Sequence, residues 1–177
     1  MRKILLGFLT GTILLSCNNA EVKSSATTND STAKTPTDLP YTARYTANWS
    51  DSVSDADLKM VLTTYKDWTD ANMAGLENAL ADTVELDMSD GTHLKKPKAD
   101  IIKLWKSYRD SLSSINIKMD TWHKMYATDK NEGYIVTWYD ETDSFKNGKV
   151  DSASYHDINQ VKDGKIVWYS QFKRPKK

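Results

Sequence analysis

The chain has 177 residues, with 24 basic and 24 acidic side chains and therefore a formal net charge of zero. Charges of both signs are interspersed, which excludes the concentrated basic surface that binds nucleic acid. The single cysteine excludes a disulfide framework, so the fold must be held together by its core. The length is enough for one domain behind an N-terminal leader.

Residues 1–16 have the layout of a secretory signal peptide, with two basic residues before an apolar run that is too short to span a bilayer. The run ends in LLSC at residues 14–17, which resembles a bacterial lipobox, and Cys17 is the only cysteine. We therefore expect cleavage before Cys17, acylation of its thiol and attachment to the membrane through the lipid. Asn18 favours delivery to the outer membrane of the cell envelope and leaves the leaflet open. The alternative is an ordinary signal peptide in which Cys17 is incidental.

Residues 17–40 combine the lipidated cysteine with a flexible tether rich in Ser and Thr, which has too little apolar surface to fold. Three aromatic rings stand in the polar lead-in that follows, residues 41–57: Tyr41, Tyr45 and Trp49. We expect the lead-in to pack on the domain because exposed rings reduce solubility, and a partner-binding patch is the alternative. Residues 174–177 form a basic tail that is solvated or touches anionic lipid.

Amphipathic helices are predicted in the first part of the domain. Residues 54–57 resemble a capping box, and apolar residues then recur at helical spacing, so a helix should run to about Asn72. The elements expected next are a short helix over residues 75–81 and a short strand over residues 83–87. Another helix should begin at Pro97 and extend its apolar stripe as far as Leu112.

Four strands in succession are predicted in the second part of the domain, over residues 115–127, 132–144, 149–161 and 165–173. Asn-Gly at residues 147–148 and Asp-Gly at residues 163–164 are strong hairpin signals, because a type I′ turn needs positive φ at both central residues. Helices followed by an antiparallel meander predict an α+β fold in which the sheet curls around the helices.

Two short motifs stand within this order of elements, LADT at residues 80–83 and KDGKIV at residues 162–167. With that order, they make residues 58–173 resemble the nuclear transport factor 2-like superfamily, also called SnoaL-like or ketosteroid-isomerase-like. The resemblance implies a cone-shaped, curved antiparallel sheet, a four-strand meander plus a short strand, packed on N-terminal helices. The segment PYTARY at residues 40–45 also looks like the lead-in of envelope lipoproteins that carry this domain. The superfamily contains enzymes and binding modules, so the fold alone assigns no activity.

The resemblance implies three candidate catalytic residues. Tyr65 falls where ketosteroid isomerases carry the oxyanion-hole tyrosine, Asp87 where they carry the general base, and Asp157 where they carry a protonated carboxylic acid. A base, two hydrogen-bond donors and a dry pocket together stabilise an enolate. The alternative for each residue is structural: a core tyrosine, an aspartate that caps a turn, and an aspartate that faces solvent.

The three histidines of the chain are candidate metal ligands: His93, His123 and His156. They fall in a loop and on two different strands, without the short paired spacing that metal sites usually show. We expect no metal site and no cofactor, and we interpret these side chains as surface or hydrogen-bonded core histidines.

Aromatic residues concentrate on the elements that line the cone in the superfamily. The residues expected to line a ligand pocket are Trp68, Trp105, Trp138, Tyr139, Tyr155, Tyr169 and Gln171. Alternation along a strand places Trp138 and Tyr139 on opposite faces but does not indicate which face is concave. A filled core is the alternative to an apolar pocket. Because both faces carry apolar residues, we expect the outer face to be covered as well, either by the aromatic lead-in or by a second subunit in a homodimer.

These observations favour a cell-envelope lipoprotein whose domain is a non-catalytic module for a small apolar ligand or an envelope protein. Two alternatives stay open at this point. The first is an isomerase or dehydratase that uses Tyr65, Asp87 and Asp157. The second is a dimeric interaction or assembly subunit.

Overall fold

The computed structural model describes residues 39–176, and all of them belong to one compact unit. The three helices are α1 (Asp55–Thr69), α2 (Met73–Ala79) and α3 (Lys98–Arg109). The strands are β1 (Trp49–Ser50), β2 (Leu80–Asp87), β3 (His93–Pro97), β4 (Leu112–Ala127), β5 (Glu132–Phe145), β6 (Val150–Lys162) and β7 (Lys165–Pro175). None of the helices in the described part of the chain is long and apolar enough to cross a membrane.

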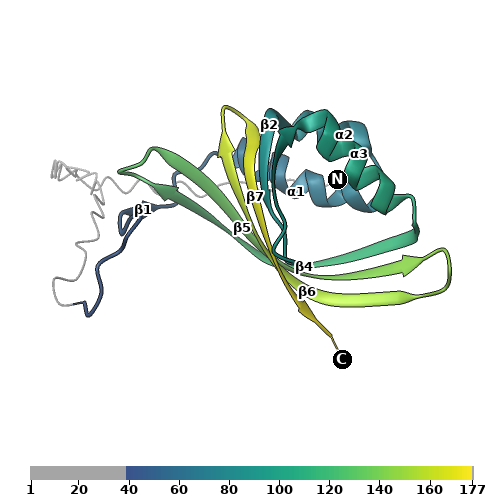
Figure 1. Cartoon of the computed structure of the whole chain (residues 1–177). Coiled ribbons are helices and arrows are strands. Elements are labelled where there is room, and N and C mark those ends of the chain that lie inside the picture. The colour runs from purple at the N-terminus through teal and green to yellow at the C-terminus, as the bar shows by residue number, and fades with distance from the viewer. Residues whose placement is uncertain (1–38, 177) are drawn as a thin grey trace, which may run out of the picture. The chain divides into compact units, whose positions relative to one another are not determined.

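The strands form one curved, open sheet (Figure 1), and their order in it is β1-β4-β5-β6-β7-β2-β3. Strands β4 to β7 make the predicted antiparallel meander. Its last turn has positive φ at both Asp163 and Gly164, as a type I′ turn requires. The predicted α+β class, the curved sheet and the four-strand meander are therefore confirmed.

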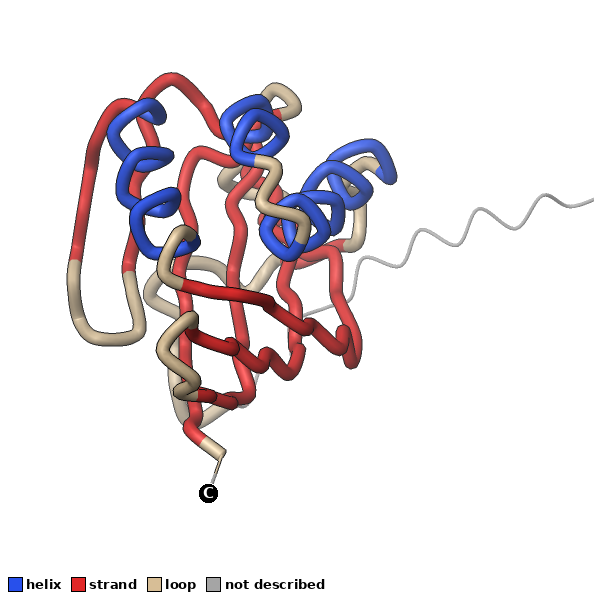
Figure 2. Tube along the Cα trace, turned by 90° about the vertical axis from the view of Figure 1, so that its right-hand side faces the viewer, coloured by secondary structure: helices blue, strands red, loops and turns tan. Residues whose placement is uncertain are grey.

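All three helices lie on the same side of the sheet, as both views show (Figures 1 and 2). Ser54 caps the N-terminus of helix α1, and its hydroxyl accepts a hydrogen bond from the Asp57 amide at 3.0 Å. This cap satisfies one of the free amides of the first turn. The covered side of the sheet is its concave face, and it carries Ile135 and Tyr139, which are 0% and 3% exposed.

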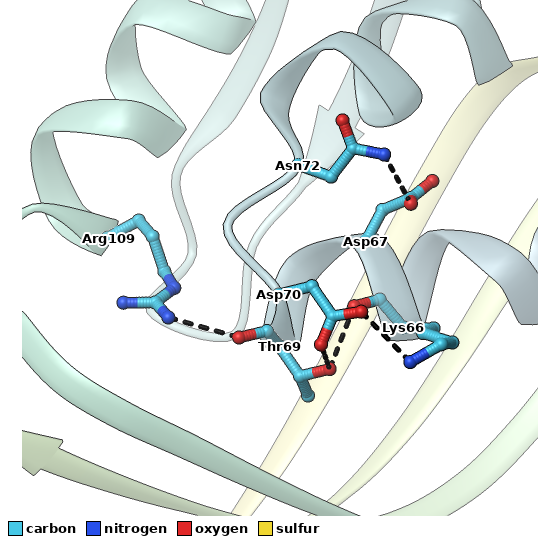
Figure 3. Close-up of polar contacts among 6 residues, drawn as sticks. All are labelled: Lys66, Asp67, Thr69, Asp70, Asn72 and Arg109. Atoms are coloured by element: carbon cyan, nitrogen blue, oxygen red, sulfur yellow. Dashed lines mark hydrogen bonds and ion pairs between the residues drawn. The ribbon is translucent and has the colours of Figure 1, made fainter.

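The C-terminal end of α1 is tied to both neighbouring helices (Figure 3). Arg109 at the end of α3 donates to the carbonyl oxygens of Trp68 and Thr69, at 3.2 and 3.0 Å. Asn72, which caps α2, donates to Asp67 of α1 at 2.8 Å. These hydrogen bonds from Arg109 hold the C-terminal ends of α1 and α3 close together.

The aromatic lead-in lies against the edge of the sheet that ends in β1. Strand β1 pairs with β4, and Trp49 contacts Tyr134 of β5 edge to face, with ring centroids 6.0 Å apart. The hydroxyl of Tyr45 contacts Tyr134 at 2.8 Å and also the carboxylate of Glu132. Tyr41, in contrast, is 87% exposed.

Local sequence patterns misplaced several boundaries. Leu112 was expected on a helix, but α3 ends at Arg109 and Leu112 opens β4, where it is 2% exposed. Strand β3 was not predicted, because four of its five residues are exposed and it has no apolar alternation. The parallel pairing of β2 with β7 was also missed, since the residues that it joins are far apart in the sequence.

Replacing Ile101 by Ala is expected to lower the free energy of unfolding by about 2–5 kcal/mol. Ile101 is 0% exposed and belongs to the core between α3 and the sheet, so the shorter side chain leaves a cavity. Urea denaturation measures the loss. Lys103→Ala on the same helix is the matched control, because the Lys103 side chain is 79% exposed. Equal stabilities of the two variants would contradict the assignment of Ile101 to the core.

Candidate functional site

A cavity of about 520 Å³ lies between the helices and the concave face of the sheet. Its apolar wall includes aliphatic side chains such as Leu76 and Leu80 of the α2–β2 region. The aromatic residues that line it are Tyr65, Trp68, Trp105, Tyr108, Tyr139, Tyr155 and Tyr169. A cavity of this volume, mostly apolar and with a few polar groups, has the character of a small-molecule site.

Asp157 lies behind the aromatic wall and binds three tyrosines. It is 0% exposed, and its Oδ2 accepts hydrogen bonds from the hydroxyls of Tyr139, Tyr65 and Tyr169, at 2.8, 3.0 and 3.0 Å. Its Oδ1 has no partner among the described residues. Burial raises the pKa of Asp157 to about 7, and the three tyrosine hydrogen bonds oppose that rise.

The hydroxyl protons of these tyrosines are directed at Asp157 rather than at the cavity. Each tyrosine has one proton to donate. Tyr65 also lies 2.6 Å from the Thr137 hydroxyl and accepts a bond from Asn159 at 3.4 Å. If Tyr65 donates to Asp157, then Thr137 donates to Tyr65, and no proton of Tyr65 remains for an oxyanion. The structure therefore brings Tyr65 and Asp157 together, but they hydrogen-bond to each other and to neighbouring side chains, and the Tyr65 hydroxyl has no proton left for a ligand.

Glu141 is a polar residue of the cavity wall that sequence reasoning missed. It lies on β5, two residues after Tyr139 and therefore on the same face, and it is 8% exposed. Burial, followed by the charges of Asp143 and Asp157, raises the pKa of Glu141 to about 8. The alternation of β5 contained the signal, because once Tyr139 faces inward, Glu141 and Asp143 must face inward too.

Asp143 extends this acidic row along the concave face. It is 3% exposed, and its Oδ2 accepts a hydrogen bond from the Tyr108 hydroxyl at 2.8 Å. Its Oδ1 has no partner within residues 39–176. Burial raises the pKa of Asp143, and hydrogen bonds from Tyr108 and Glu141 oppose the rise. The concave face thus buries three carboxyl groups close to the cavity.

The placement of Asp87 corrects the expectation that it is a general base in the pocket. Asp87 follows Leu86 on β2, and Leu86 is 0% exposed in the core, so alternation turns Asp87 to the outer face. There it accepts a hydrogen bond from the Trp168 indole and contacts His93 Nδ1, each at 2.7 Å. The hydrogen bond with His93 holds the pKa of Asp87 below its ordinary value. The predicted catalytic set is therefore not assembled.

Trp138 is a second correction, because it lies on the outer face and not on the pocket wall. It is 37% exposed and stacks on His156, with ring centroids 4.8 Å apart, and His156 stacks on Phe172. The six other residues predicted for the pocket line the cavity: Trp68, Trp105, Tyr139, Tyr155, Tyr169 and Gln171. The homodimer expected through the outer face stays a prediction.

The histidines lie apart from the cavity. His93 contacts Asp87 as described, and its Nε2 is 3.9 Å from Glu85. His156 lies in the outer stack, and His123 is exposed on β4. Within residues 39–176, no group of His, Cys, Asp and Glu side chains is arranged to hold a metal ion.

Comparison with known proteins gives the fold its class. No family model matches the sequence, and no curated protein matches it. An LEH-like epoxide hydrolase of M. tuberculosis matches at 9% identity and TM-score 0.57, over 67% of this chain and 83% of that one. An NTF2-like protein of unknown function from Burkholderia pseudomallei matches at 13% identity and TM-score 0.56, over 68% and 92%.

A third structure is a protein of ketosteroid isomerase-like fold from Catenulispora acidiphila, in complex with trimethylamine. It matches at 13% identity and TM-score 0.53, over 64% of this chain and 84% of that one. This chain therefore has the nuclear transport factor 2-like fold. Proteins with different activities share that fold, so the function has to be inferred from the residues of the site and not from the fold.

Proposed function

We propose that this protein is a non-catalytic binding module that holds a small, largely apolar molecule in the cavity between its helices and its sheet. The observation that carries the proposal is the cavity itself, about 520 Å³ with seven aromatic side chains on its wall. Burial of ligand surface against such a wall is the dominant source of affinity in sites of this kind.

The arrangement of polar groups supports binding rather than isomerisation. Proton abstraction next to a carbonyl needs a base within reach of the substrate, and the residue expected in that role, Asp87, faces the other side of the sheet. An oxyanion hole needs free donors, whereas the hydroxyl of Tyr65 is engaged by Asp157 and Thr137.

The structural neighbours are compatible with this proposal. One of them, the protein of ketosteroid isomerase-like fold, was crystallised in complex with the small molecule trimethylamine. We also propose that the module is attached to the cell envelope through a lipid on Cys17. Residues 1–38 lie outside the described residues, so this part of the proposal depends on the sequence motif alone.

Replacing Trp68 by Ala is expected to weaken binding of the neutral apolar dye Nile red by about tenfold or more, since a buried aromatic side chain contributes about 1.5–3 kcal/mol. Trp68 lines the cavity and stacks on Tyr108, with ring centroids 6.2 Å apart. A fluorescence titration of residues 39–176, the part of the chain that the structure describes, measures the dissociation constant.

Trp138→Ala is the matched control for this titration, because Trp138 is also a partly exposed tryptophan but lies on the outer face. It should change the dissociation constant by less than about twofold, as expected for a surface substitution away from the site. Equal losses in the two variants, or no saturable binding to the unsubstituted protein, would refute the proposed function.

A further inference from the structure

We propose that the ligand of this cavity is a protonated amine with an apolar body, whose ammonium group pairs with Glu141 while its body packs between the aromatic side chains. This inference rests on the proposed function and adds the chemical class of the ligand. Three independent features of the cavity support it: its hydrogen-bonding character, its charge and the geometry of its rings.

The hydroxyl groups around the cavity have largely spent their protons within the protein. Tyr65, Tyr139 and Tyr169 donate to Asp157, and Tyr108 donates to Asp143. Tyr65 also accepts hydrogen bonds from Thr137 and Asn159. Lone pairs remain on the hydroxyl oxygens of the other three tyrosines, so these groups can accept a hydrogen bond but have no proton to donate. A ligand that satisfies them must itself be a donor, and an ammonium group carries up to three N–H bonds.

The charge of the site has the same implication. Glu141 lines the cavity at 8% exposure, and its hydrogen-bond partners, Trp68 and Asp143, bring no positive charge to it. One oxygen of Asp143 and one of Asp157 are without partners among residues 39–176. A buried carboxylate is costly unless it is protonated or paired with a cation.

The cationic side chains next to the cavity are already engaged. Lys173 lies at its rim, but its ammonium group is 2.9 Å from Asp151. Arg109 donates to the carbonyl oxygens of Trp68 and Thr69. The positive charge that would neutralise Glu141 must therefore come from a proton or from the ligand.

The rings are arranged to receive a cation as well as an apolar body. Tyr139 stacks on Tyr155 with centroids 5.2 Å apart and meets Tyr65 edge to face at 5.0 Å. Trp68 stacks on Tyr108, with centroids 6.2 Å apart. Lys173 Nζ already lies 5.6 Å from the centroid of Tyr155. Ring faces carry partial negative charge, so an ammonium group that lies against a ring face on the cavity wall is attracted even before it reaches a carboxylate.

Binding of such a ligand should be coupled to loss of a proton from Glu141. The groups that face Glu141 are Asp143 on its own strand, Asp157 and Tyr155 on β6, Lys173 on β7, Trp68 on α1 and Tyr108 on α3. With the pKa of Glu141 at about 8 in the empty site, pairing with an ammonium ion requires deprotonation. Affinity should then rise as the pH rises to about 8, by roughly 50-fold between pH 6 and pH 8 for one released proton.

The test is isothermal titration calorimetry of the full chain in detergent with two probes of the same size and shape. Phenethylamine is cationic over this pH range, and 2-phenylethanol is its neutral counterpart. We expect phenethylamine to bind at least tenfold more tightly than the alcohol at pH 8 and to lose affinity as the pH falls. Glu141→Gln should abolish both the advantage of the amine and its pH dependence, whereas Asp87→Asn should change neither.

Binding of both probes with equal affinity, or an amine affinity that is unaffected by Glu141→Gln, would overturn the inference and leave the proposed function intact. Failure of both probes and of Nile red would overturn the inference together with the proposed function. If Glu141→Gln did not fold, the pH dependence measured on the unsubstituted protein would still decide, since a neutral Glu141 that donates to the ligand predicts the opposite sign.

Discussion

Between pH 4 and pH 9 the free energy of unfolding is expected to fall by several kcal/mol. Asp157 has a pKa of about 7 in the folded protein and 3.8 as its ordinary value, and Glu141 has a pKa of about 8 against 4.5. The folded state therefore binds these protons more tightly than the unfolded state. The stabilisation is fully present below the ordinary pKa values and is lost as the pH rises through 7 and 8.

The size of the effect follows from these intervals. Each unit of difference between the folded and the ordinary pKa corresponds to about 1.36 kcal/mol of unfolding free energy. The difference for Asp157 therefore corresponds to a loss of stability on the order of 4 kcal/mol, and the difference for Glu141 to a similar loss. Asp157 and Glu141 are 0% and 8% exposed, so solvent screens their charges only weakly. This is a large share of the stability of a typical domain.

Urea denaturation at a series of pH values measures this slope. Asp157→Asn should flatten it, because the amide does not titrate and its oxygen can still accept from the tyrosines. Asp87→Asn is the control, since the pKa of Asp87 is lowered and its contribution is lost at acid pH, in the opposite sense. A slope that is the same in all three proteins would show that Asp157 does not contribute to the pH dependence of stability.

Replacing Cys17 by Ser is expected to abolish membrane attachment altogether. In the proposed lipoprotein the acyl chains depend on Cys17 for their attachment, and each buried CH₂ contributes about 0.8 kcal/mol to anchoring, so their loss would leave no comparable membrane contact. Growth with an alkyne-labelled fatty acid, followed by membrane fractionation, measures both the label and the location. Because Cys17 is the only cysteine of the chain, any label removed by the substitution must have been on it.

Asn18→Asp is the matched control for this experiment. It leaves the thiol in place, so we expect full labelling and continued membrane attachment, with a shift toward the inner membrane. A protein with Cys17→Ser that still carries the label or still sediments with membranes would show that the LLSC motif at residues 14–17 is incidental.

Much of the fold could be predicted because its signals are local. The Asp-Gly turn at residues 163–164 has the positive φ values that its composition requires, and alternation defined the long strands around it. The pairing of β2 with β7 could not be predicted in the same way, because it depends on which distant strand offers a free edge. Leu112 was assigned to a helix since its spacing fits a helical stripe, but tertiary packing places it in β4.

The site was harder to predict from the sequence than the fold. Whether a strand residue lines the cavity depends on which face of the sheet it occupies, and alternation alone does not give that face. Tyr65 and Asp157 were suggested by resemblance, and the structure brings them to 3.0 Å. Asp87 and Trp138 were expected inside and lie outside, as the inward-facing neighbours Leu86 and Tyr139 require. Glu141 was overlooked because an acidic residue in a strand is usually solvent-facing.

The position of β7 within the sheet also sets the order in which the protein can be completed. Strand β7 is the last to be synthesised, yet it lies between β6 and β2 and joins the two halves of the sheet. Until its 11 residues have emerged, β2 and β3 have no partner that connects them to the meander. The sheet therefore cannot be completed before β7 has been synthesised, and deletion of β7 should separate β2 and β3 from the meander.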